Sequence, residues 1–159
     1  HKEWTMGKGK TCSFFGHREL DIDEKLEVKV EKTIIDLIEK EKITTFLFGG
    51  LGMFDDLCYK VVSKLKEKYV NIKRVMCLHD PRHMRESKRP QWMKEEQYEN
   101  FVHFSLQYDY WRKRIYFRNL EMINLSDVVV FFVHETENSG AYKAFQYAKK
   151  MKKLIINLY

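Results

Sequence analysis

Residue types that bind phosphate occur at two glycine turns in the sequence. The longer turn, Gly49-Gly50-Leu51-Gly52, ends a β-branched and aromatic run and leads into a helical pattern. Glycines allow positive φ angles and remove Cβ atoms, so backbone N–H groups can approach a ligand closely. The N-terminus of the next helix adds unpaired donors and the positive end of a dipole. The pattern predicts a phosphate site, although a tight turn without a ligand would look the same.

Charged side chains occur beside these glycines. Arg18, in Gly16-His17-Arg18, could make a forked contact with phosphate, or it could be a surface residue next to a loop capped by His17. Asp55 and Asp56 are the only carboxylates of the longer turn, so they are the candidate catalytic residues if the protein is an enzyme. They could stabilise an oxocarbenium ion or activate water. Alternatively, Asp55 only caps the following helix.

Hydrophobic patterning predicts the elements that position these residues. Helical spacing is expected after Asp21 or Asp23, after Gly52 to about Tyr69, over 111–125 and from Gly140 through Met151. Apolar runs predict five strands at 11–16, 44–48, 72–78, 128–133 and 154–158. Alternating strands and helices indicate a single-domain α/β fold, a Rossmann-like, doubly wound parallel sheet with helices on both faces. In the order 3-2-1-4-5, the turns after the first, second and fourth strands meet at the switch point of the sheet.

Two segments depart from this alternation. Residues 1–10 are polar, and we expect them to be disordered or left over from cloning, with residues 11–159 forming the domain. Residues 80–110 contain both prolines and are too long for an ordinary connection, so we expect an inserted flap with a helical turn around Met93 to Phe101. His79 and His83 lie four residues apart but have no evident third ligand, so no metal site is expected.

Composition limits the classes of function. A net charge of +6 suits nucleic acid or a phosphorylated small ligand, but the lysine clusters lie toward helix C-termini, where cations are favoured anyway. No apolar run approaches the ~18 residues that span a bilayer. Three cysteines without a Cys-x-x-Cys pair indicate reduced thiols in a cytoplasmic protein.

Several segments, in this order along the chain, resemble the SLOG superfamily, the Rossmann-like group of Smf/DprA DNA-processing proteins and LOG phosphoribohydrolases. The sequence is most similar to small stand-alone YpsA-like bacterial members, and the resemblance extends from Lys10 to Leu158. The matching segments are Cys12 to Arg18, Phe48 to Asp55, Arg118-Asn119 with Met122, Ser126-Asp127 before a β run, and Gly140-Ala141-Tyr142-Lys143.

The resemblance implies a site for a nucleotide or a nucleotide-derived ligand, either ADP-ribose- or NAD-like or a nucleoside phosphate. Its phosphate would lie on the Gly49-Gly50 turn and the helix that begins at Gly140. The expected ligand-binding residues are Gly16, His17, Arg18, Gly49, Gly50, Leu51, Gly52, Asp55, Arg118, Asn119, Ser139, Gly140 and Ala141. No separate cofactor is expected, and a homodimer is left open.

Three functions compete at this point. The first is binding of the ligand by a sensor or signalling module. The second is hydrolysis of a nucleotide N-glycosidic bond, but the hydrolases carry Pro-Gly-Gly-x-Gly-Thr followed by a glutamate. Here Phe48 replaces the proline, Met53 replaces the threonine, and Asp56 stands near the place of the glutamate. The third is DNA binding, which no helix-turn-helix pattern or interleaving of aromatic and basic residues supports.

Overall fold

Six parallel strands form the sheet of the computed structural model, which describes residues 9–104, 107–135 and 139–159. The strand order is β4-β3-β2-β1-β5-β6, and every pair is parallel. The strands are β1 (Lys10–Gly16), β2 (Ile43–Phe48), β3 (Lys73–Leu78), β4 (Asn100–His103), β5 (Val128–Phe132) and β6 (Leu154–Asn157). The predicted α/β class is confirmed, with the five predicted strands in the predicted order as β3-β2-β1-β5-β6.

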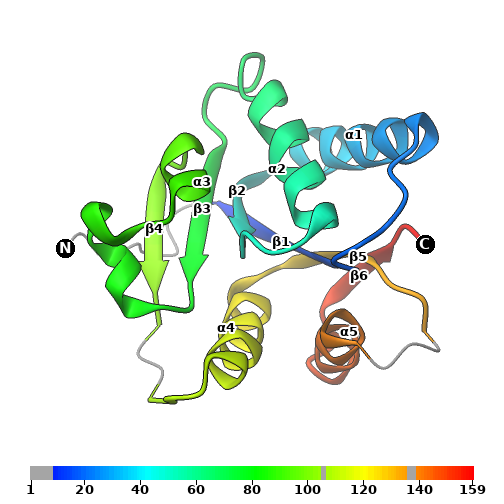
Figure 1. Ribbon diagram of the computed structural model, residues 1–159. Coiled ribbons are helices and arrows are strands. Elements are labelled where there is room, and N and C mark those ends of the chain that lie inside the picture. The colour runs from blue at the N-terminus through cyan, green and yellow to red at the C-terminus, as the bar shows by residue number, and fades with distance from the viewer. Residues whose placement is uncertain (1–8, 105–106, 136–138) are drawn as a thin grey trace.

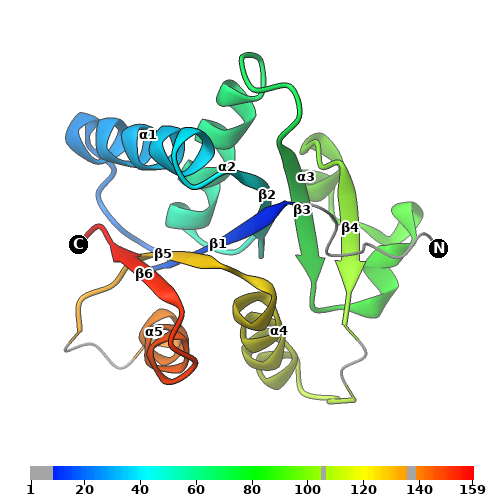
Figure 2. The ribbon, with the colours of Figure 1, turned by 180° about the vertical axis from the view of Figure 1, so that it is seen from behind.

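Helices cover both faces of the sheet, as Figures 1 and 2 show from opposite sides. Helices α1 (Glu24–Glu39) and α2 (Met53–Leu65) lie on one face, and α4 (Trp111–Leu125) and α5 (Gly140–Lys150) lie on the other. Alternating side chains of β1 explain this, because Phe14 packs in the core beneath α1 and α2 while Phe15 packs in the core beneath α4 and α5. The short α3 (Gln91–Glu95) covers the β3–β4 edge.

The segment over residues 80–110 differs from the expected flap. It holds two 3₁₀ turns, η1 (Pro81–Met84) and η2 (Glu86–Lys88), then α3 and the sixth strand. The predicted helical turn around Met93 to Phe101 is present but lies earlier: α3 contains Met93 and ends at Glu95, while Phe101 lies in β4. Met93 is only 4% exposed and packs on Met76 and Leu78 of β3. The part from α3 to β4 therefore packs on the edge of the sheet, whereas η1 and η2 contain no buried residue.

Two further expectations concern the ends and the surface of the fold. Lys10 already belongs to β1, and the rest of the expected disordered segment, residues 1–8, lies outside the described residues. Within the described ranges, no helix is both long and apolar enough to cross a membrane. Cys12, Cys58 and Cys77 are buried free thiols.

Candidate functional site

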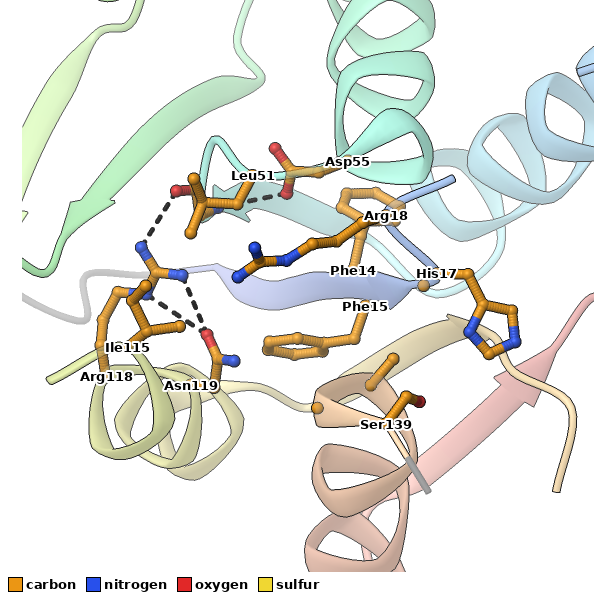
Figure 3. A pocket seen from close by; sticks show the side chains of 14 residues that line it. Phe14, Phe15, His17, Arg18, Leu51, Asp55, Ile115, Arg118, Asn119 and Ser139 are labelled. Atoms are coloured by element: carbon orange, nitrogen blue, oxygen red, sulfur yellow. Dashed lines mark hydrogen bonds between the residues drawn. The ribbon is translucent and has the colours of Figure 1, made fainter. Parts of the chain in front are cut away.

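A cavity of about 330 Å³ lies at the carboxyl ends of the central strands (Figure 3). Its walls come from the turns after β1 and β2, the inner side of α4 and the N-terminus of α5. All but two of the expected ligand-binding residues line it: Gly16, His17, Arg18, Gly49, Leu51, Asp55, Arg118, Asn119, Ser139, Gly140 and Ala141. The strand order accounts for this meeting of distant segments, because it places the ends of β1, β2 and β5 side by side.

Gly50, Gly52 and Asp56 lie outside this cavity and border a smaller one of about 50 Å³. Gly50 has a φ of 73°, and a Cβ there would come within 2.6 Å of the Met76 Cε atom and 2.9 Å of the Trp92 ring. A side chain at Gly50 would therefore disturb the packing of α3 rather than enter the cavity. Asp56 forms an ion pair with Lys60 at 2.9 Å, one turn along α2.

The Asp55 carboxylate holds the glycine turn from inside. Its Oδ1 accepts a hydrogen bond from the Gly49 N–H at 3.2 Å, and its Oδ2 accepts one from the Gly50 N–H at 2.9 Å. The expectation that these two donors face a phosphate is therefore wrong for this conformation, since Asp55 occupies both. Helix α2 begins after Gly52 without a side-chain cap, so Asp55 is not the helix cap either. Burial raises the pKa of Asp55 to about 6, although the two N–H groups and Arg118 oppose the shift.

Arg118 ties three parts of the site together. Its Nη1 donates to the carbonyl oxygens of Gly49 and Cys77, both at 3.0 Å, at the ends of β2 and β3. Its Nε and Nη2 donate to the Asn119 Oδ1 at 3.3 and 3.0 Å. Arg118 is 2% exposed, and of the acidic side chains that the structure describes none forms an ion pair with it. Burial lowers the pKa of Arg118.

Arg18 brings a second guanidinium to the same cavity. Its side chain extends over Phe14 and Phe15 toward Arg118 (Figure 3). The Arg18 carbonyl accepts a hydrogen bond from the Met53 N–H at 2.8 Å, which fixes the β1 turn against the start of α2. The proximity of Arg18 contributes to the lowered pKa of Arg118, as expected for two like charges.

The N-terminus of α5 forms the opposite wall. Ser139 is the N-cap, and its Oγ accepts a hydrogen bond from the Tyr142 N–H at 3.1 Å. The N–H groups of Gly140 and Ala141 precede the first intrahelical hydrogen bond, which runs from Lys143 to Ser139. Among the described residues, apart from the chain neighbours of Gly140 and the backbone of its own helix, no atom lies within 4 Å of the place where a Cβ on Gly140 would be.

His17 positions a loop at the edge of the cavity. Its Nε2 accepts a hydrogen bond from the His134 N–H at 3.1 Å, which links the turn after β1 to the segment after β5. His17 thus acts on the shape of the cavity through the β5 loop.

Three apolar residues of the cavity were missed from the sequence: Phe14, Phe15 and Ile115. Phe14 and Phe15 are core residues whose rings lie on opposite sides of the end of β1 and also border the cavity (Figure 3). Their position directly before Gly16, at the carboxyl end of a central strand, is the signal that could have identified them. They give the cavity an apolar floor beneath its cationic wall.

His79 and His83 do not line the cavity itself but a smaller neighbouring one of about 30 Å³, which shares Gly49, Leu51 and Arg118 with it. The rings of His79 and His83 are 6.5 Å apart, and burial lowers the pKa of His79 to about 4. Within the described ranges, no group of three or more His, Cys, Asp or Glu side chains is arranged to hold a metal ion.

Comparison with known proteins finds a protein of similar fold but identifies no family. No family model and no curated protein matches the sequence. Among solved structures, the chain is similar to the Moco carrier protein of Chlamydomonas rheinhardtii, with a TM-score of 0.54 and 16% sequence identity. The match covers 96% of this chain and 77% of that protein. At this level of identity the similarity concerns the fold alone.

Proposed function

We propose that this protein binds a phosphorylated, nucleotide-derived ligand in the cavity of Figure 3 and acts as a sensor or signalling module. The observation that carries the proposal is Arg118, a guanidinium that is 2% exposed and has no carboxylate partner among the described residues. A buried guanidinium is costly to desolvate, and Asp55, which interacts with Arg118 electrostatically, forms hydrogen bonds with the glycine turn instead of an ion pair with it. An anionic ligand would add a directly paired counter-charge.

Two other features of the cavity favour the same class of ligand. Arg18 extends into it from the β1 turn, and the N-terminus of α5 presents N–H groups beside open space. Both favour phosphate oxygens. The apolar floor of Phe14 and Phe15 suits the less polar part of a nucleotide. The SLOG resemblance, part of this proposal, suggests ADP-ribose, NAD or a nucleoside phosphate. The buried thiols favour a cytoplasmic setting.

Hydrolysis of an N-glycosidic bond would depend on Asp55 alone. Asp56 borders a different cavity and is paired with Lys60, so it is poorly placed for chemistry on the same ligand. Asp55 borders the cavity, but each of its oxygens already accepts a backbone hydrogen bond. This arrangement favours a positioning role for Asp55 and therefore binding without turnover.

The test combines identification with titration. Mass spectrometry of small molecules released from the purified protein should find a phosphorylated compound. Calorimetry with ADP-ribose, NAD, AMP and Moco should show saturable binding of at least one. Enzyme-dependent release of free base from AMP or NAD would favour the hydrolase instead. If no phosphorylated compound is retained and none of the panel binds, the proposed function is contradicted.

A further inference from the structure

The cavity that carries two guanidinium groups also carries one carboxylate. Asp55 is the only acidic side chain among the described residues that line it, and it is 8% exposed. Arg118 does not form an ion pair with Asp55, because its guanidinium donates its hydrogen bonds to two backbone carbonyls and Asn119. Instead, Asp55 is held by the N–H groups of Gly49 and Gly50. An anionic ligand would therefore enter a cavity whose wall holds a like charge.

A like charge brought close to a buried carboxylate favours its neutral form. Once protonated, one oxygen of Asp55 carries hydrogen and no longer accepts well from the turn, while the other oxygen still does. With the proton on Oδ1, the N–H group of Gly49, which lines the cavity, would then be available to the ligand. The phosphate-binding turn expected from the glycine pattern would thus form only when Asp55 is neutral.

We propose that Asp55 takes up a proton from solvent when an anionic ligand binds in the cavity, so that occupancy is coupled to pH. This inference rests on the proposed function. It makes Asp55 a positioning residue, which acts through the Gly49-Gly50 turn and through its own charge.

Few other groups near Asp55 could take up this proton. Burial raises the pKa of Asp55 to about 6, whereas burial raises the pKa values of Cys58, Cys77 and Tyr98 far above neutrality. Asp56 adds a like charge from the next position, and Arg118 adds the opposite charge from α4. The cavity is also lined by the imidazole of His17, which packs against the β5 loop. A test must therefore separate Asp55 from His17.

ADP-ribose is a suitable probe, because its two diphosphate charges do not change between pH 6 and 8. Calorimetry at pH 7 in two buffers with different ionisation enthalpies counts the protons exchanged. If the ligand raises the Asp55 pKa by one unit or more, about 0.4 proton or more is taken up per ligand. The dissociation constant should then be lower at pH 6 than at pH 8 by about fivefold or more.

Three variants assign the proton. Asp55→Asn should bind ADP-ribose with no proton uptake, and the matched control Asp56→Asn should take up as much as the wild type, because Asp56 borders another cavity. His17→Gln should also keep the uptake. Binding without proton uptake by the wild type, or loss of uptake in His17→Gln or Asp56→Asn, would overturn the inference and leave the proposed function standing. If Asp55→Asn does not fold, the proton counts of the other three proteins still decide. Absence of binding by ADP-ribose, NAD, AMP and Moco at every pH, with no phosphorylated compound retained by the purified protein, contradicts both proposals.

Discussion

Two buried arginines at opposite ends of the sheet differ in what balances their charge. Arg74, near the start of β3, is 7% exposed and forms a forked pair with Glu99, with its Nε at 3.0 Å and its Nη2 at 2.6 Å from the carboxylate oxygens. Its Nη1 donates to the Ser63 hydroxyl at 3.0 Å. The hydrogen bond with Glu99 raises the pKa of Arg74. This guanidinium is fully paired within the fold.

Arg118, at the carboxyl ends of the strands, is more deeply buried than Arg74 and has the opposite electrostatics. Its partners are two carbonyls and an amide oxygen, and burial lowers its pKa. The two sites show that the fold can supply a counter-ion to a buried arginine where the arginine is structural. We infer that the charge of Arg118, which has no ion-pair partner among the described residues, serves to bind a ligand.

The largest expected effect is on stability at the Arg74 site. Arg74→Met leaves the Glu99 carboxylate without its forked partner, although Glu99 is partly exposed and Lys66 lies 3.8 Å away. We expect the free energy of unfolding to fall by about 2–4 kcal/mol. Urea denaturation followed by circular dichroism measures this fall. Ligand affinity should not change in the folded variant, and a tenfold loss of affinity would break the contrast between the two arginines.

The next effect concerns how stability depends on pH through Asp55, the carboxylate that lines the same cavity as Arg118. Because burial raises the Asp55 pKa from 3.8 to about 6, the folded state binds more protons than the unfolded state in this range, and Asp55 makes the fold less stable as pH rises from 4 to 6. The wild type should therefore lose about 1–3 kcal/mol relative to Asp55→Asn across this window. His79 has the opposite slope but is common to both proteins. Urea denaturation of both proteins at several pH values measures this loss. If the difference in free energy of unfolding between the wild type and Asp55→Asn is the same at every pH, the pKa of Asp55 is not raised in the folded protein.

The smallest effect is expected at the α5 wall. Gly140→Ala adds a Cβ with no neighbour within 4 Å, so the fold should be unaffected. The methyl group would stand in the open space beside the helix N-terminus and weaken ligand binding by about 1 kcal/mol, or fivefold. Calorimetry on the folded variant measures this loss. An unchanged affinity would remove the α5 wall from the site and leave the arginines as its anion-binding part.

The sequence predicted the parts of the site that depend on strand order. Gly16, Gly49 and Ser139 each follow a buried strand, and parallel strands in the order found bring their ends together. The missed strand β4 has four residues, of which only Val102 is buried, so its pattern is too short to separate from a loop.

The hydrogen-bond partner of each polar group in the site could not be predicted from the sequence. Spacing placed Asp55 beside the glycine turn, but it gave no sign that the carboxylate would take the N–H groups of Gly49 and Gly50. Arg118 contacts the Gly49 carbonyl across 69 positions of sequence, and that contact depends on how α4 packs on the sheet. The sequence therefore indicates which residues meet, while the free and occupied polar groups follow from the packed structure.

The central claim is that the charge of Arg118 is reserved for a ligand. Its most direct test is titration of ADP-ribose into the wild type, Arg118→Met and Arg74→Met in parallel, with each protein shown to be folded. The account predicts that Arg118→Met loses about 1.5–3 kcal/mol of binding free energy, more than tenfold in affinity, while Arg74→Met binds as the wild type does. Equal affinities for the wild type and Arg118→Met, or equal losses in the two variants, would contradict it.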